Sequence, residues 1–144
     1  MIQAQNVKKA QLIRPGAIVN NTSWTSQNVD TLGFTYATLC FQLGALDAAI
    51  TALKVQHSED GSTNWGDISG ADFSASTLPS ATDDNGFFSV YVNLHNKRRY
   101  LRCVATIANG ATGGYLSAHC DLSGATICPS SASERGNTGE LLVS

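Results

Sequence analysis

Short runs in which apolar and polar residues alternate make up most of the chain, and Gly, Asn, Asp and Ser separate them. The three clearest runs follow one another between Phe87 and Leu122. In each run every second residue is apolar or small, which is the period of a β-strand with one buried face. Turn-forming segments at 95–98 and 109–114 separate the runs. This pattern predicts an antiparallel meander of three adjacent strands.

Further strands are expected on the N-terminal side of the meander. The run Val7–Ile13 ends shortly before Pro15, which lacks the N–H that a strand interior needs. The longest run, Thr31–Leu43, is rich in the aromatic and β-branched residues that strands favour. Another run, Ile50–Ser58, alternates and leads into the turn-forming Asp60-Gly61-Ser62. Together these runs predict one all-β domain.

Small residues occupy inward positions of the meander, which indicates that a second sheet packs closely against it. They are Cys103, Ala105, Ala118 and Cys120. The expected fold class is therefore an antiparallel β-sandwich. Cys103 and Cys120 fall near the same level of one predicted hairpin, which leaves a cross-strand disulfide as the alternative to reduced, buried thiols. Reduced thiols are the expectation because the N-terminus lacks the apolar segment of a signal peptide.

Composition argues against several classes of protein. Of 144 residues, 42% are hydrophobic and only 14% are charged, against about 25% charged in an average soluble domain. This balance does not match intrinsic disorder. Nine basic residues do not outnumber eleven acidic ones, which argues against binding nucleic acid through bulk positive charge. No apolar run approaches the roughly 20 residues that span a bilayer, so no membrane partner is expected either.

The chain is expected to form a single sandwich domain over residues 1–128, within which residues 1–29 are a candidate N-terminal arm. The following segment up to Glu140 is polar and rich in small residues, which is typical of a flexible segment. A flexible tail is therefore predicted over residues 129–144. The tail carries an apolar tip of three residues, Leu141, Leu142 and Val143. This tip is either a frayed terminus or a contact that docks on a neighbouring molecule or sheet edge.

Three polar residues are expected on the outward face of the last predicted hairpin: Arg102, His119 and Asp121. Such a group can carry out acid–base chemistry, but no nucleophile or pocket accompanies it. A cross-strand ion pair between Arg102 and Asp121 is the favoured interpretation. The acidic turn Asp83-Asp84-Asn85-Gly86 lacks the spacing and the final Glu of an EF-hand. We therefore expect no catalytic residue, no metal site and no cofactor, and the protein is not expected to be an enzyme.

Two turns carry distinctive residues. The segment Ser58–Trp65 resembles the Asp-box of sialidase-like propellers, although its Gly falls one place early. It predicts a structural hairpin whose Trp65 packs back on the sheet. The basic cluster of the chain begins in the first turn of the meander and comprises Lys97, Arg98 and Arg99, with Tyr100 and Arg102 beside them. This cluster is either a contact for phosphate or for an acidic partner surface, or a charged turn that keeps the sheet soluble.

A longer layout connects several of these elements. The segment Asp30–Phe34 leads into the aromatic run, and a Glu-Asp-Gly-Ser turn at 59–62 precedes Trp65. The segment Ile68–Phe73 follows and reads Ile-Ser-Gly-Ala-Asp-Phe. This layout resembles small structural proteins of tailed bacteriophages, in particular capsid decoration (cement) proteins. The resemblance spans residues 30–108, and its motifs consist of turn chemistry and core packing.

The resemblance implies a β-sandwich of jelly-roll type on the outer surface of the virion head, made in the host cytoplasm. It also implies a homotrimer that binds the major capsid protein and has no catalytic residues. The candidate partner contacts along the chain are Tyr91, Lys97, Arg98, Arg99, Tyr100, Leu141, Leu142 and Val143.

Two other functions stay open at this point. A tail-tube or head–tail connector component is also a small β-sandwich, but it assembles into rings. A carbohydrate- or receptor-binding module would use exposed aromatic residues as a platform. The candidates for that platform are Trp24, Trp65, Tyr91, Tyr100 and Tyr115, of which Tyr91 and Tyr100 are expected on outward strand faces.

Overall fold

The structure, a computed structural model, describes residues 3–74 and 76–143. Within them one short 3₁₀ helix, η1 (Gln3–Asn6), precedes eight β-strands. The strands are β1 (Lys8–Ile13), β2 (Val29–Asp30), β3 (Tyr36–Leu46), β4 (Ile50–Ser58), β5 (Gly66–Asp72), β6 (Phe87–Asn93), β7 (Tyr100–Ile107) and β8 (Gly114–Ser123). In the described part of the chain no helix is long and apolar enough to span a membrane.

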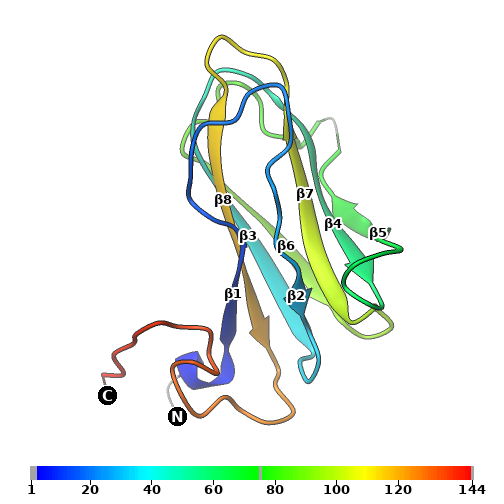
Figure 1. The fold of residues 1–144 in the computed structure, drawn as a ribbon, viewed down its shortest axis with the longest axis vertical. Coiled ribbons are helices and arrows are strands. Elements are labelled where there is room, and N and C mark those ends of the chain that lie inside the picture. Colours follow the sequence, from blue (N-terminus) through cyan, green and yellow to red (C-terminus); the bar gives the residue numbers. More distant parts are fainter. Residues whose placement is uncertain (1–2, 75, 144) are drawn as a thin grey trace.

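The eight strands form two antiparallel sheets, and the strands run roughly along the long axis of the molecule (Figure 1). One sheet has the order β1-β8-β3-β6 and is called the β8–β3 sheet below; the other has the order β2-β7-β4-β5. The chain changes sheet at every connection except the one between β4 and β5. This order is that of a jelly roll, and the predicted all-β antiparallel sandwich is confirmed.

The predicted meander of three adjacent strands is wrong. β6 and β8 both pair with β3 in one sheet, whereas β7 lies between β2 and β4 in the other. The connections 94–99 and 108–113 therefore cross from sheet to sheet instead of closing hairpins. An alternating pattern indicates that one face of a strand is buried, but the pattern does not indicate which other strand pairs with that strand.

The inner faces of the two sheets form one hydrophobic core. The predicted inward positions of β7 and β8 are buried, namely Leu101, Cys103, Ala105, Ile107, Leu116, Ala118, Cys120 and Leu122. Phe41 on β3 is the largest of the fully buried side chains in the described residues. Because β3 is paired on both sides, this ring lies in the middle of the packed layer.

All four cysteines have free thiols. Cys103 on β7 and Cys120 on β8 belong to opposite sheets, so the hairpin on which the disulfide alternative depended does not exist. Burial raises the pKa of Cys103 to about 11 and that of Cys120 to about 12. Both thiols are therefore protonated at neutral pH and serve as small apolar side chains of the core.

Most of the candidate N-terminal arm takes part in the sandwich. β1 pairs with β8 at one edge of its sheet, and the chain after it runs beside β7, where Ser23 bridges to Thr106. The side chains of Leu12 and Trp24 belong to the core. Residues 8–29 are thus built into the domain, while Met1 and Ile2 lie outside the described residues.

The segment after β8 returns along the lower end of the molecule, beside η1 and the start of β1 (Figure 1). The backbone N–H of Lys9 donates to the carbonyl of Arg135 at 2.8 Å. The guanidinium of Arg135 is buried, with the Glu140 carboxylate and the carbonyl of Pro129 as hydrogen-bond partners. This part of the segment is therefore a compact loop around a buried ion pair.

The apolar tip at Leu141–Val143 lies beyond this loop and is exposed. The flexibility predicted for residues 129–144 concerns motion and stays a prediction, and Ser144 lies outside the described residues. The conformation of the first part of the segment is held by the hydrogen bonds of Arg135 and by the contact with Lys9.

Candidate functional site

The three residues considered for acid–base chemistry do not come together. Asp121 on β8 forms an ion pair with Lys9 of β1, with Nζ and Oδ1 3.1 Å apart. Arg102 lies on the other sheet and donates from Nε to Gln56 Oε1 at 2.9 Å. His119 Nε2 is 3.9 Å from Asp121 Oδ2 on an open sheet face. The predicted pair of Arg102 with Asp121 is therefore wrong, because β7 and β8 are not neighbours.

The acidic turn before β6 uses its carboxylates to cap backbone groups. Asp84 Oδ1 accepts a hydrogen bond from the N–H of Leu46 at 2.8 Å. Asp83 Oδ2 accepts from the N–H and the hydroxyl of Ser80, and these bonds lower the pKa of Asp83. Across residues 3–74 and 76–143, no group of three or more His, Cys, Asp and Glu side chains is placed to hold a metal ion.

The segment Ser58–Trp65 forms the hairpin connection between β4 and β5, as predicted. Asp60 Oδ1 accepts from the N–H groups of Ser62 and Thr63, each at 2.8 Å, and the hydroxyl of Thr63 donates to Oδ2. These bonds hold the pKa of Asp60 well below its usual range. The guanidinium of Arg102 lies over the ring of Trp65, with its central carbon 4.4 Å from the centroid of the ring. The role of this turn is structural.

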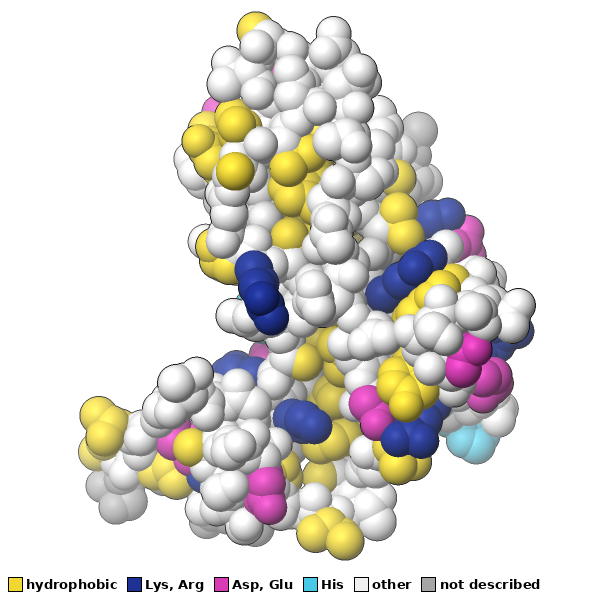
Figure 2. All heavy atoms as spheres, viewed as in Figure 1, with side chains coloured by type: hydrophobic (Ala, Val, Ile, Leu, Met, Phe, Trp, Pro, Cys, Tyr) yellow, Lys and Arg dark blue, Asp and Glu magenta, His cyan; other side chains and the backbone are white. Residues whose placement is uncertain are grey.

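The basic cluster lies in the connection between β6 and β7, and most of its charge is paired. Arg99 donates two hydrogen bonds to the carboxylate of Asp30, at 2.9 and 2.7 Å, and this contact lowers the pKa of Asp30. Arg98 donates to the carbonyl of Asn64 at 2.8 Å and lies 3.8 Å from a carboxylate oxygen of Glu59. In Figure 2, basic and acidic side chains alternate at the lower right of the molecule.

Four exposed apolar side chains lie on neighbouring segments at the lower end of the sandwich. Leu32 is 66% exposed, Tyr36 51%, Tyr91 79% and Ile127 86%. Tyr36 on β3 and Tyr91 on β6 line one shallow hollow on the outer face of their sheet. Tyr36 also lies over the backbone of Gly124, close to the segment that carries Ile127. We call Leu32, Tyr36, Tyr91 and Ile127 the apolar end patch, and Figure 2 shows hydrophobic side chains at this end of the molecule.

Backbone hydrogen bonds fix the segments that carry the apolar end patch. The N–H of Thr126 donates to the carbonyl of Gly33 at 2.8 Å, and the N–H of Thr35 donates to Ser123 at 3.1 Å. On the other side, the N–H of Leu94 donates to the carbonyl of Thr35 at 2.9 Å. The connection between β2 and β3 is thus held by its neighbours on both flanks. A patch on such a preformed frame loses little conformational freedom when a partner binds.

The other candidate partner contacts are dispersed. Lys97 is exposed and has no ion-pair partner among the described residues. Tyr100 is half-buried against the turn at Gly61, so it is not an open platform. In the tip, Leu141 and Val143 are 92% and 85% exposed, and they end a lobe that projects from the body (Figure 2).

Sequence reasoning identified Tyr91 but missed the other members of the apolar end patch. Leu32 and Tyr36 were included in a strand run that was expected to pack inward on one face. Ile127 lies between Thr126 and Cys128, after the last predicted strand. An apolar residue next to Gly in a turn-forming segment is the signal that could have marked Leu32, which precedes Gly33. No comparable signal marks Ile127, and singly exposed apolar residues are common.

Comparison with known proteins adds no relative. No protein-family model matches the sequence, and no curated protein shows significant similarity to it. Inferences about function therefore depend on the fold and on the surfaces described above.

Proposed function

We propose that this protein is a capsid decoration protein that binds the outer surface of a bacteriophage head and stabilises contacts between copies of the major capsid protein. The observation that carries the proposal is the apolar end patch. Exposed apolar side chains brought to one end of a soluble domain indicate an interaction site, and the segments that carry these side chains are fixed by backbone hydrogen bonds. The jelly-roll order of the strands is compatible with the proposal, since this fold recurs in viral capsid proteins.

The binding energy expected from a single patch is the reason why the proposal includes a homotrimer. Full burial of one side chain of this size contributes about 1.5–3 kcal/mol, so four contribute about 6–12 kcal/mol at most. Association itself costs about 4–15 kcal/mol in lost freedom of motion. One patch alone would therefore bind weakly. Three patches held in one trimer would bind together at a high effective concentration.

The open edge of the β8–β3 sheet supports self-association. β6 pairs with β3 on one side, and no described strand pairs with its other side. Phe87 on this edge strand is 67% exposed. An open edge with apolar side chains is an aggregation hazard in a monomer, and a neighbouring subunit would cover it.

Co-sedimentation with DNA-filled heads that lack the protein tests the proposal. Saturable binding with a small-integer ratio per capsomer, together with greater resistance of the heads to heating, is expected. Isolated major capsid protein should bind weakly, because the site would span several subunits. The absence of binding to heads would refute the proposal, and self-assembly into rings or tubes would favour a tail component instead.

A further inference from the structure

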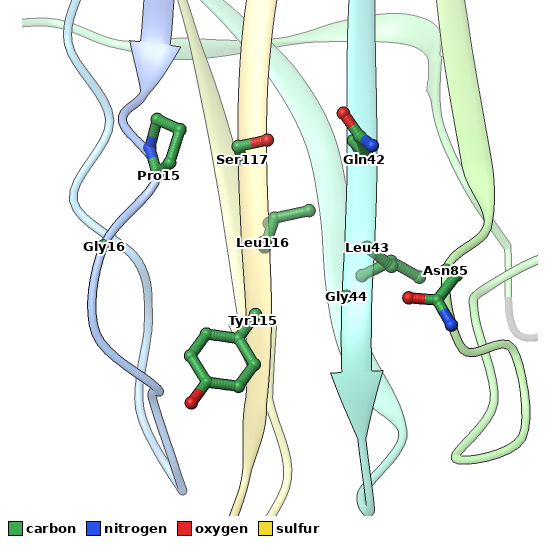
Figure 3. Close-up of a pocket in the computed structure, with 9 residues that line it drawn as sticks. All are labelled: Pro15, Gly16, Gln42, Leu43, Gly44, Asn85, Tyr115, Leu116 and Ser117. Atoms are coloured by element: carbon green, nitrogen blue, oxygen red, sulfur yellow. The ribbon is translucent and has the colours of Figure 1, made fainter.

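A second surface feature lies toward the other end of the strands from the apolar end patch, on the outer face of the β8–β3 sheet. It is a hollow between the ends of β3 and β8, flanked by Pro15–Gly16 on one side and Asn85 on the other (Figure 3). It is a shallow hollow that opens to solvent, with a volume of about 350 Å³. Gln42 of the hollow and Thr38, the strand partner of Tyr91, are four residues apart on β3, which places the hollow about 13 Å from the patch along the strand.

Gly44 shapes the floor of this hollow. A Cβ atom at this position would lie 3.0 Å from the Cβ of Tyr115 on the neighbouring strand. Without a side chain there, the floor is open backbone, and Tyr115 and Asn85 stand on its two sides (Figure 3). Asn85 is fixed in place because its N–H donates to the carbonyl of Gly44 at 3.1 Å. The hollow is therefore preformed and does not require movement of a loop.

The lining of the hollow combines apolar surface with several polar groups and carries no charged side chain. Gln42 and Ser117 are paired residues on adjacent strands, and Asn85 and the hydroxyl of Tyr115 complete the polar groups. Within the described residues, none of these four side chains has a hydrogen-bond partner in the protein. Amide and hydroxyl groups both donate and accept hydrogen bonds, so the lining offers both functions to a ligand.

This chemistry discriminates between classes of ligand. A phosphate or carboxylate would find no cationic side chain among the lining residues. A purely apolar ligand would cover the amides and leave them without partners, which costs free energy. A neutral polyhydroxylated ligand satisfies the amides with its hydroxyl groups, and its C–H face can pack against the ring of Tyr115.

We propose that this hollow binds a neutral saccharide, in the form of one or two sugar units of a longer glycan. The site lies at the other end of the strands from the apolar end patch, so a subunit attached through the patch would leave the hollow accessible. The inference does not depend on the capsid role, since it follows from the hollow itself.

An array of neutral and anionic oligosaccharides, followed by an NMR titration with the best neutral probe, tests this inference. We expect binding in the millimolar range, with shifted amide signals at Gly44, Asn85 and Tyr115. Tyr115→Ala and Gln42→Ala should each weaken binding at least about tenfold, because they remove the ring and one amide. Tyr91→Ala is the matched control, since Tyr91 is an exposed tyrosine on the same sheet but does not line the hollow.

The outcomes separate this inference from the capsid proposal. Tyr115→Ala should lose the glycan and keep head binding, whereas Ile127→Ser should lose head binding and keep the glycan. Unchanged melting temperatures would show that both variants fold. Failure of every neutral glycan to bind at millimolar concentration would overturn the inference. Preference for anionic glycans, or equal binding by Tyr115→Ala and the wild type, would also overturn it.

Discussion

Replacement of Ile127 with serine is expected to weaken attachment to the head by an amount that follows from its exposure. Ile127 is 86% exposed in the free protein, so it contributes little to folding, and the substitution acts only where a partner would cover the side chain. Full burial of such a side chain contributes about 1.5–3 kcal/mol, which equals about a 10- to 150-fold change in dissociation constant for one patch. In a trimer bound through three patches, the losses add, and the half-saturating concentration should rise at least about a hundredfold.

Sedimentation of heads with increasing amounts of wild type or Ile127→Ser measures this difference. Tyr115→Ala serves as the control, because it removes a partly exposed aromatic side chain at the other end of the same sheet. Thermal unfolding should give the same melting temperature for Ile127→Ser as for the wild type. If Ile127→Ser saturates the heads at the same concentration as the wild type, the apolar end patch is not the docking surface.

Three further predictions concern the fold. Phe41→Ala should lower the free energy of unfolding by about 3–5 kcal/mol, measured in urea, because it leaves a cavity in the centre of the core; a loss below about 1 kcal/mol would contradict the packing. Gly136→Ala should detach the C-terminal loop and speed hydrogen exchange at the amide of Lys9, since the new Cβ would overlap the Lys9 carbonyl and Gly136 has a φ of 77°; unchanged exchange would contradict that contact. The thiols of Cys103 and Cys120 should not react with an aromatic disulfide reagent until the protein unfolds. Labelling of either thiol in the native state would contradict their burial.

The sequence was sufficient to predict which face of most strands is buried. Leu101, Cys103, Ala105 and Ile107 alternate with less buried residues, and the structure buries all four. The turn after β4 could also be predicted from its sequence, Asp60-Gly61-Ser62, and in the structure the Asp60 carboxylate accepts hydrogen bonds from two backbone N–H groups of this turn. Both features are local, because side-chain period and backbone capping depend on residues close in the sequence.

The order of the strands could not be predicted, because it depends on contacts between distant segments. Val104 on β7 is opposite Lys54 on β4, although the sequence placed β7 beside β6 and β8. A six-residue connection can close a hairpin or cross a sandwich, and alternation is the same in both cases. The small inward residues indicated a second sheet but not which strands belong to it.

The candidate surfaces were missed for the same reason. Leu32 and Ile127 lie far apart in the sequence, and hydrogen bonds such as the one between Thr126 and Gly33 bring their segments together. The hollow beside Tyr115 depends on Gly44 of the adjacent strand. The burial of Arg135 was also unpredictable, since a polar segment rich in small residues is typical of flexible chain.

Cryo-electron microscopy of heads saturated with the protein tests the central proposal most directly. Trimers should occupy three-fold or quasi-three-fold positions on the outer shell, with Leu32, Tyr36 and Ile127 against the major capsid protein and the hollow at Tyr115 exposed. Bare heads, or subunits attached through the end that carries Tyr115, would contradict the proposed docking surface.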